Sequence, residues 1–348
     1  MRATLVLMDH AHLYEQARFM MQKGKGILAA DESVSTMNER LASVLVDETA
    51  EMRRIYRQVL FTAPGIEKYL SGVIFFDASL RSSTDAGVPF PDLLAARGIM
   101  PGIKVDKGVV DIVEYPGEKV SQGLDDLDER MWEYANLGAY FAKWRAVVPI
   151  TDTTPAESIM AMNAVMLARY ASICQKEGIV PMVEPEVLMH GDHSVGRSEE
   201  VTTKALQILF TTLREYKVDL KAVILKTSMV IAGDGEKQQT RPDEVADATL
   251  RMLRLSVPYE VPGIVFLSGG QSAVRATENL QAIASRGAQP WPITFSYSRA
   301  IEEPVLATWK GKAENVAKAQ AVLLHRLKMN SFAAQGTYNS QMEKEIQA

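Results

Sequence analysis

The stretch KAVILKTSM, residues 221–229, runs from apolar residues into a lysine, and this pattern decides the fold. Seven other stretches share its character, each a short apolar run, and most of them end in a charged or hydroxyl-bearing residue. In chain order they are GILAAD (26–31), GVIFFD (72–77), MPGIKVD (100–106), AYFAKWRAVVPI (139–150), GIVPMVEPEV (178–187), GIVFLSGG (263–270) and WPITFSYSR (291–299). Runs rich in Val, Ile, Phe and Tyr that open with Gly or Pro are typical of β-strands.

Longer amphipathic stretches separate these runs and predict helices. The predicted helices are 36–60, 121–138, 155–177, 198–216, 241–256, 271–287 and 304–330, while 81–98 has two prolines and only a short helical stretch. Strands that alternate with helices pair in parallel, and eight of them favour a closed α/β barrel, the (β/α)8 TIM barrel. The alternative is an open doubly wound sheet, which ordinarily carries a Gly-rich dinucleotide fingerprint that GILAADES lacks.

Length and composition fit one large enzyme domain. The 348 residues are 47% hydrophobic and 23% charged, and we expect a single barrel over 1–348, with a short N-terminal helix and a C-terminal extension at about 331–348. No apolar run approaches the roughly 20 residues that span a bilayer. The start of the chain, MRATLVLMDHAHLYEQ, lacks the features of a signal or transit peptide, so we expect a cytoplasmic protein.

Charge and cysteine content narrow the class of partner. The net charge is −5 and no basic block appears, so we expect neither nucleic acid nor membrane as a partner, but a small molecule. The single cysteine, Cys174, excludes an internal disulfide and a multi-cysteine metal site. It lies in the apolar stretch LARYASICQ, where inert packing is expected.

Charged residues at the ends of the predicted strands give the strongest functional signal. Lys104 and Asp106 are two residues apart, as are Lys143 and Arg145, and Glu184 and Glu186; Asp31, Asp77, Lys226, Ser268 and Arg299 end other runs. Residues two apart on a strand share a face, and burying them against the helices would be costly. We therefore expect them at the carboxyl-end mouth of the barrel. A lone charge there is as often a solvated loop residue, and an ion network that plugs the barrel is a second alternative.

Three lysines on one face suggest amine chemistry. A lysine attacks a ketone only when it is uncharged, a state favoured by burial or by neighbouring cations. Lys226 follows the most apolar approach, AVIL, although the residues alone do not select it over Lys104 or Lys143. The resulting iminium draws electrons from the neighbouring C–C bond, and carboxyl groups must move the protons. Glu184, Glu186 and Asp31 are available for this work.

The stretch FLSGGQS, residues 266–272, predicts a phosphate site. It ends a strand and opens a helix, and its two glycines let the backbone approach a ligand near helix N-terminal amides. Arg299 ends the next strand and would stand beside it in a closed barrel. A Gly-Gly pair alone is as often only a tight turn. Together these residues indicate a phosphorylated substrate.

The sequence resembles class I fructose-bisphosphate aldolase, the Schiff-base family, from about residue 12 to about residue 340. The motifs that carry the resemblance are GKGILAADES, GIKVDKGVV, FAKWR, ARYASICQ, GIVPMVEPE, ILK, VFLSGGQS and TFSYSRA, in family order and spacing. The resemblance implies reversible cleavage of fructose 1,6-bisphosphate to dihydroxyacetone phosphate and glyceraldehyde 3-phosphate in glycolysis and gluconeogenesis. It also implies a homotetramer, with no cofactor and no metal.

The resemblance also implies a role for individual residues. Lys226 matches the Schiff-base lysine, and Glu184 the proton acceptor that works on the carbinolamine. Among the other catalytic positions, Lys143 matches the second lysine, Asp31 the carboxylate that deprotonates the C4 hydroxyl, and Glu186 a supporting glutamate. Lys104 and Arg145 match the C6-phosphate end, Ser33 and Arg40 the loop and helix after the first strand, and Ser268, Gly269 and Arg299 the C1-phosphate site, with Gly270 beside them.

Several positions depart from the family pattern. Residues 227–229 read Thr-Ser-Met where well-known members have Pro-Asn-Met, and DESVST differs from the familiar Asp-Glu-Ser-Thr-Gly-Ser. Ser298 replaces the usual glycine, and Glu39, which precedes Arg40 in place of a lysine, would put an acid near a phosphate. The sequence ends in EKEIQA without the terminal tyrosine that serves proton exchange on the three-carbon enamine, and Tyr338 matches an earlier tyrosine.

Three other functions compete with this interpretation. A metal-dependent aldolase would need clustered histidines, and among the five present His190 and His193 lie close in sequence, on either side of Asp192. A Schiff-base enzyme for another sugar, such as sedoheptulose bisphosphate or a ketose monophosphate, would keep the same lysine. A non-catalytic barrel has no reason to keep a buried lysine beside carboxylates.

Overall fold

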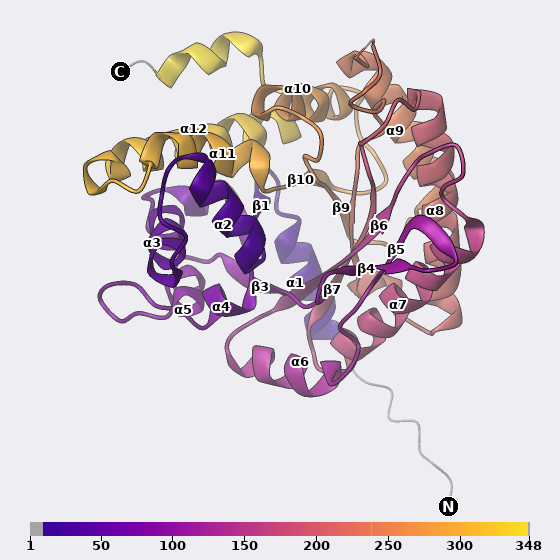
Figure 1. Cartoon of the computed structure of the whole chain (residues 1–348), viewed down its shortest axis with the longest axis horizontal. Helices are drawn as coiled ribbons and strands as arrows, with labels where there is room; N and C mark the ends of the chain where they lie inside the picture. Colours follow the sequence, from indigo (N-terminus) through magenta and orange to yellow (C-terminus); the bar gives the residue numbers. More distant parts are fainter. Residues whose placement is uncertain (1–9, 238, 347–348) are drawn as a thin grey trace, which may run out of the picture.

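Eight parallel strands close into a barrel in the computed structural model, which describes residues 10–237 and 239–346 (Figure 1). The strand order around the barrel is β1-β10-β9-β8-β7-β6-β3-β2. The strands are β1 Gly26–Ala30, β2 Leu70–Phe75, β3 Met100–Lys104, β6 Phe141–Val148, β7 Val180–Val187, β8 Ile224–Thr227, β9 Gly263–Phe266 and β10 Ile293–Tyr297. Each lies within or overlaps one of the eight predicted runs, so the predicted TIM barrel is confirmed.

Helices follow the strands and cover the outside of the barrel (Figure 1). After the short α1, Ala11–Met20, they are α2 Val34–Ser43, α3 Ala50–Phe61, α4 Asp77–Leu80, α5 Phe90–Ala95, α6 Leu127–Asn136, α7 Glu157–Lys176, α8 Val195–Glu215, α9 Pro242–Ser256, α10 Ala273–Ala284, α11 Arg299–Trp309 and α12 Val316–Ala334. Buried Cys174 lies in α7, as the apolar stretch around it predicts.

Two of the predicted helices are each two helices in the structure. The stretch 36–60 is divided between α2 and α3 at Leu45, whose φ of 61° is incompatible with helix. The stretch 304–330 is divided between α11 and α12, where Lys310 and Gly311 have φ of 52° and 71°. In each pair both helices bury apolar residues in the same core cluster, so the apolar residues alone do not mark where one helix ends.

An antiparallel hairpin between β3 and α6 was not predicted. It consists of β4, Val109–Ile112, and β5, Tyr115–Ser121, so the helix expected from residue 121 begins only at Leu127. The hydroxyl of Ser121 donates to the carbonyl of Arg145, 2.5 Å away, and anchors the hairpin to β6. Gly108 and Val109, at its start, reach the carboxyl-end mouth of the barrel.

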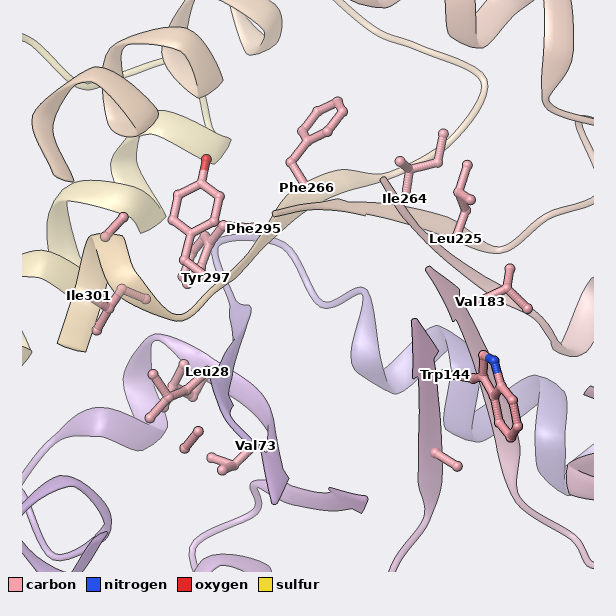
Figure 2. Packing of buried hydrophobic residues seen from close by; sticks show 14 of the residues in the cluster. Leu28, Val73, Trp144, Val183, Leu225, Ile264, Phe266, Phe295, Tyr297 and Ile301 are labelled. Carbon is pink, nitrogen blue, oxygen red and sulfur yellow. The ribbon is translucent and has the colours of Figure 1, made fainter. Parts of the chain in front are cut away.

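Side-chain alternation along the strands divides the core into two layers. Outward-facing residues such as Leu28, Trp144 and Leu225 pack against the helices (Figure 2). Inward-facing residues near the strand starts, including Ile27, Phe141, Met182, Ile224 and Val265, form a separate apolar cluster with Leu13, Ala17 and Met20 of α1. Thus α1 closes the amino end of the barrel, and inward positions farther along the strands are left to carry the charged residues.

The chain ends pack differently from the barrel. Residues 1–9, which belong to the stretch predicted to lack a signal or transit peptide, lie outside the described residues. At the other end, residues 331–334 finish α12, and a 3-10 helix, Ser340–Ile346, follows. Glu343 in it pairs with Arg326 of α12 at 2.5 Å and accepts from the hydroxyl of Tyr338 at 3.1 Å. Among the described helices none is both long and apolar enough to cross a bilayer.

Candidate active site

A cavity of about 350 Å³ opens at the carboxyl ends of the strands. The cavity is lined by all the catalytic and substrate-binding residues that the family resemblance implies, except Gly270: Lys226, Glu184, Lys143, Asp31, Glu186, Ser33, Arg40, Lys104, Arg145, Ser268, Gly269 and Arg299. These residues come from strands or loops that are far apart in the sequence, and only closure of the barrel brings them together. An ion network that fills the barrel does not describe this site, because open space lies above the charges.

Four buried charges form a chain across the cavity floor. Asp31 Oδ2 lies 2.7 Å from Lys143 Nζ, Lys143 Nζ lies 3.0 Å from Glu184 Oε2, and Glu184 Oε1 lies 3.0 Å from Lys226 Nζ. Lys143 thus has two carboxylate neighbours and Lys226 has one. Glu184 connects the two amines, an arrangement suited to passing a proton between an amine and a carboxylate.

The two lysines hold both carboxylates in the ionised form. Burial is the largest single influence on Asp31 and raises its pKa, but Lys143 and Lys226 together outweigh it and lower the pKa to about 2. The same balance lowers the pKa of Glu184. For Lys143, burial lowers the pKa, but Asp31 and Glu184 outweigh burial and raise it well above the usual lysine value. Lys143 is therefore an ammonium at neutral pH.

Burial does not distinguish Lys226 from Lys143. The two residues are 3% and 4% exposed, whereas the side chain of Lys104 is 14% exposed. The apolar approach to Lys226 therefore does not make it more desolvated than Lys143, because Lys143 is enclosed to the same degree. The difference between the two amines is the number of carboxylates around each.

The rim of the cavity carries two further ion pairs. Arg145 donates to Glu186, and Lys104 Nζ donates to Asp106 Oδ1 at 2.6 Å. Asp106 Oδ2 also accepts from the backbone N–H of Arg145 at 3.2 Å, which joins β3 to β6. Two cationic side chains are thus presented at this side of the mouth.

Helix starts supply a second set of groups that suit an anion. Ser33 is the N-cap of α2 and accepts from Thr36 N, and Ser272 is the N-cap of α10, two residues after the Ser268–Gly269–Gly270 stretch. Arg299 is the first residue of α11 and is exposed at the mouth. Backbone N–H groups at helix N-termini attract anions, so the cavity edge near β1, β9 and β10 suits phosphate.

Three residues that the sequence places at the mouth or near a phosphate do not line the cavity. Gly270 does not line the cavity; its φ of 71° and its approach to Met189 make it a conformational residue of the turn. Asp77 also lies outside the cavity, because it begins α4, pairs with Arg81 at 3.0 Å and accepts from Tyr134. Glu39 is exposed on α2 and does not line the cavity, so its carboxylate is not among the groups that would face a bound phosphate.

Several residues that line the cavity are not among those predicted from the sequence. Glu32, Thr36, Ser296 and Ser298 face the cavity together with the expected set. Glu32 directly follows Asp31, and Thr36 stands one helical turn after Ser33. Their closeness in sequence to predicted site residues could therefore have indicated them. No local signal pointed to Arg57 and Glu302, which lie behind the cavity and pair with each other at 3.0 Å.

The histidines considered for a metal do not converge. His190 bonds to Asp234 at 2.9 Å on the surface, whereas the imidazole of buried His193 has no hydrogen-bond partner among the described residues. In residues 10–237 and 239–346, no group of three or more His, Cys, Asp or Glu side chains is placed to hold a metal ion.

A barrel mouth with two buried, carboxylate-bridged lysines and cationic edges defines an enzyme that applies amine chemistry to an anionic substrate. Comparisons with known proteins agree with this class of enzyme. Residues 12–348 match the family model described as fructose-bisphosphate aldolase class-I. The chain therefore belongs to the class-I fructose-bisphosphate aldolase family.

Individual relatives are similar over nearly their whole length. A probable fructose-bisphosphate aldolase class 1 of Xylella fastidiosa is 47% identical over 95% of this chain and 99% of its own. The cytoplasmic isozyme of fructose-bisphosphate aldolase from Cicer arietinum is 47% identical over 96% and 94%. The fructose-bisphosphate aldolase of Plasmodium falciparum, solved with TRAP and a small-molecule inhibitor, superposes with a TM-score of 0.94 at 46% identity, covering 95% of this chain and 96% of that one.

Proposed function

We propose that this protein cleaves fructose 1,6-bisphosphate reversibly to dihydroxyacetone phosphate and glyceraldehyde 3-phosphate through a Schiff base on Lys226. The observation that carries the proposal is the chain Asp31, Lys143, Glu184, Lys226, in which neighbouring groups are 2.7–3.0 Å apart. Membership of the family supports the reaction class. The reaction needs no cofactor, because an iminium on the protein is itself the electron sink.

Formation of the Schiff base uses Glu184 as the proton carrier. Glu184 takes the proton of the Lys226 ammonium, and the free amine then adds to the C2 carbonyl of the open-chain ketose. Returning that proton to the resulting carbinolamine hydroxyl lets water leave and produces the iminium. Lys143 remains an ammonium between Asp31 and Glu184 and holds both carboxylates in place.

Cleavage of the C3–C4 bond uses Asp31. Its low pKa makes it an ionised base at neutral pH, and it takes the proton of the C4 hydroxyl as the C4 aldehyde forms. The electrons of the broken bond move into the iminium and produce an enamine. Protonation of the enamine at C3 and hydrolysis of the restored iminium release dihydroxyacetone phosphate and free Lys226. Glu186, which accepts a hydrogen bond from Arg145, helps to position Glu184.

The proposal assigns the two phosphates of the substrate to two sets of residues that line the cavity. Lys104 and Arg145, with Ser33 and Arg40, receive the C6-phosphate, while Ser268, Gly269 and Arg299 receive the C1-phosphate. Support comes from the cationic side chains and helix starts on these edges. A comparison of kcat/KM for fructose 1,6-bisphosphate, sedoheptulose bisphosphate and fructose 1-phosphate tests this assignment, because phosphate contacts act on discrimination.

We also infer that the protein is cytoplasmic and forms a homotetramer. The cytoplasmic isozyme of Cicer arietinum supports the compartment. Exposed Trp132, Leu255 and Tyr259, with 64%, 66% and 73% of their surface accessible, are apolar positions suited to subunit contacts. Analytical ultracentrifugation tests the assembly, and a monomer at micromolar concentration would contradict it.

Trapping of the covalent intermediate is the decisive experiment. Borohydride is added in the presence of dihydroxyacetone phosphate, and the modified peptide is found by mass spectrometry. We expect the adduct on Lys226 and none in the Lys226→Ala variant, whose circular dichroism should match that of the native protein. An adduct on Lys104 or Lys143, or no adduct, would overturn the assignment.

A further inference from the structure

Ser298 occupies the N-cap of α11, but its hydroxyl does not cap the helix. Serines at three other helix starts behave as caps: Ser33, Ser194 and Ser272 each accept from a backbone N–H three residues later, at 3.2–3.3 Å. The side chain of Ser298 turns instead toward the β1 side of the cavity, and this unusual orientation has a specific set of partners.

The partners of Ser298 are two charged residues from the segment after β1. Its Oγ donates to Glu32 Oε1 and accepts from Arg40 Nη1 at 3.1 Å. The Glu32 side chain is 4% exposed and also accepts from Arg57, which in turn pairs with Glu302 at 3.0 Å. The hydroxyl therefore completes a buried ion network that extends behind the cavity wall.

The contact with Ser298 is one of three that hold the Arg40 side chain. Arg40 contacts Glu32, Ser298 and Glu302 through Nη1, and the residue lines the cavity. Fixing one side of a planar guanidinium orients the remaining donors. The same contact joins α2 to the turn that carries Arg299, although the two segments are 258 residues apart.

We propose that Ser298 is a positioning residue that orients Arg40 toward the C6-phosphate and so determines how strongly the enzyme favours a bisphosphate over a monophosphate. This inference rests on the proposed phosphate assignment. It concerns a position at which this chain departs from the glycine usual in the family, so the hydroxyl supplies a contact that a glycine does not offer.

The test compares fructose 1,6-bisphosphate with fructose 1-phosphate, which lacks the C6-phosphate. For Ser298→Ala and Ser298→Gly we expect KM for the bisphosphate to rise roughly 3- to 10-fold, the scale of the net contribution of one intramolecular hydrogen bond. We expect kcat and all constants for the monophosphate to change less than about 2-fold on the same scale. Ser298→Thr keeps the hydroxyl and should restore the native KM.

Two further variants separate positioning from a general structural effect. If Ser298 acts through Arg40, its replacement should add nothing to KM in an Arg40→Ala background. Ser194→Ala removes an N-cap hydroxyl from α8, far from this network, and should lower Tm without changing the ratio of the two KM values.

The outcomes distinguish this inference from the proposal beneath it. Additive effects of the two substitutions, equal changes for both sugars, or no change in Ser298→Ala would overturn the role of Ser298. If the native enzyme itself shows no preference for the bisphosphate, or Arg40→Ala leaves KM unchanged, the phosphate assignment fails instead.

Discussion

Lys143 lies between Asp31 and Glu184, and removal of its charge should change both the rate and its pH dependence. In Lys143→Met the side chain keeps its approximate size but loses the ammonium that lowers the pKa of both carboxyl groups. We expect kcat to fall by about 10²–10⁴-fold, the range for loss of positioned acid–base groups. The pKa values of the two carboxyls should rise, so the acid limb of kcat/KM should move to higher pH.

The charge-conserving variant Lys143→Arg is the control for this prediction. A guanidinium between the same carboxylates keeps their pKa values low, so the acid limb should stay near its native position even where the altered shape lowers kcat. Steady-state kinetics from pH 4 to 9 measure both quantities. Identical acid limbs in the Met variant and the native enzyme would contradict the electrostatic role of Lys143.

At the scale of elements, the turn between β9 and α10 depends on one glycine. Gly270 has φ of 71°, and an added Cβ would lie 2.7 Å from Met189 Cβ, so Gly270→Ala must displace the turn or Met189. We expect lower stability and, because Ser268 and Gly269 share the turn, a several-fold higher KM for phosphorylated substrates. Calorimetry and steady-state kinetics measure the two effects.

Gly287 offers a matched control for that substitution. Its φ of 85° is equally unfavourable for alanine, but a Cβ there meets nothing within 4 Å. Gly287→Ala should cost about 1 kcal/mol of stability through backbone strain alone and leave KM unchanged. If both variants bind substrate as the native enzyme does, the turn does not transmit the clash to the site.

For the whole molecule, buried carboxyl groups shape the dependence of stability on pH. Burial, the largest influence, and the nearby Glu32 raise the pKa of Glu302 to about 8, despite its pairing with Arg57. A folded-state pKa above the unfolded value means that the folded protein binds the proton more tightly. The stability contributed by Glu302 is therefore complete below about pH 4.5 and is lost as the pH rises toward 8.

Glu302→Gln, which copies the neutral carboxyl, should remove this loss. Its Tm should fall less than that of the native protein between pH 5 and 9, with a difference of roughly 1–3 °C for each kcal/mol in a large domain. Asp31 acts in the opposite direction, because its pKa of about 2 lies below the unfolded value, so its contribution is present above about pH 4 and is lost toward pH 2. Parallel Tm curves for the two proteins would refute the assignment to Glu302.

Local pattern was sufficient for the barrel and for most residues at its mouth. Alternating side chains and the cost of burying a charge against helices allow only the inward orientation for residues such as Lys143, Glu184 and Lys226. Asp77 does not follow this pattern because it begins α4, where its carboxylate pairs with Arg81. The helix breaks at Leu45 and Lys310 were not predicted, because the spacing of apolar residues carries no information about a single residue with positive φ.

Sequence by itself indicated the eight strands of the barrel, their closure and the kinds of chemical group at the mouth, because these follow from periodicity and burial within short segments. Tertiary structure alone decided that Glu184 lies between two lysines, and that Ser298 meets Glu32 across 266 residues. Such contacts depend on strand register and side-chain rotamers in the closed barrel. No short segment contains that information, because each partner lies on a different strand or loop.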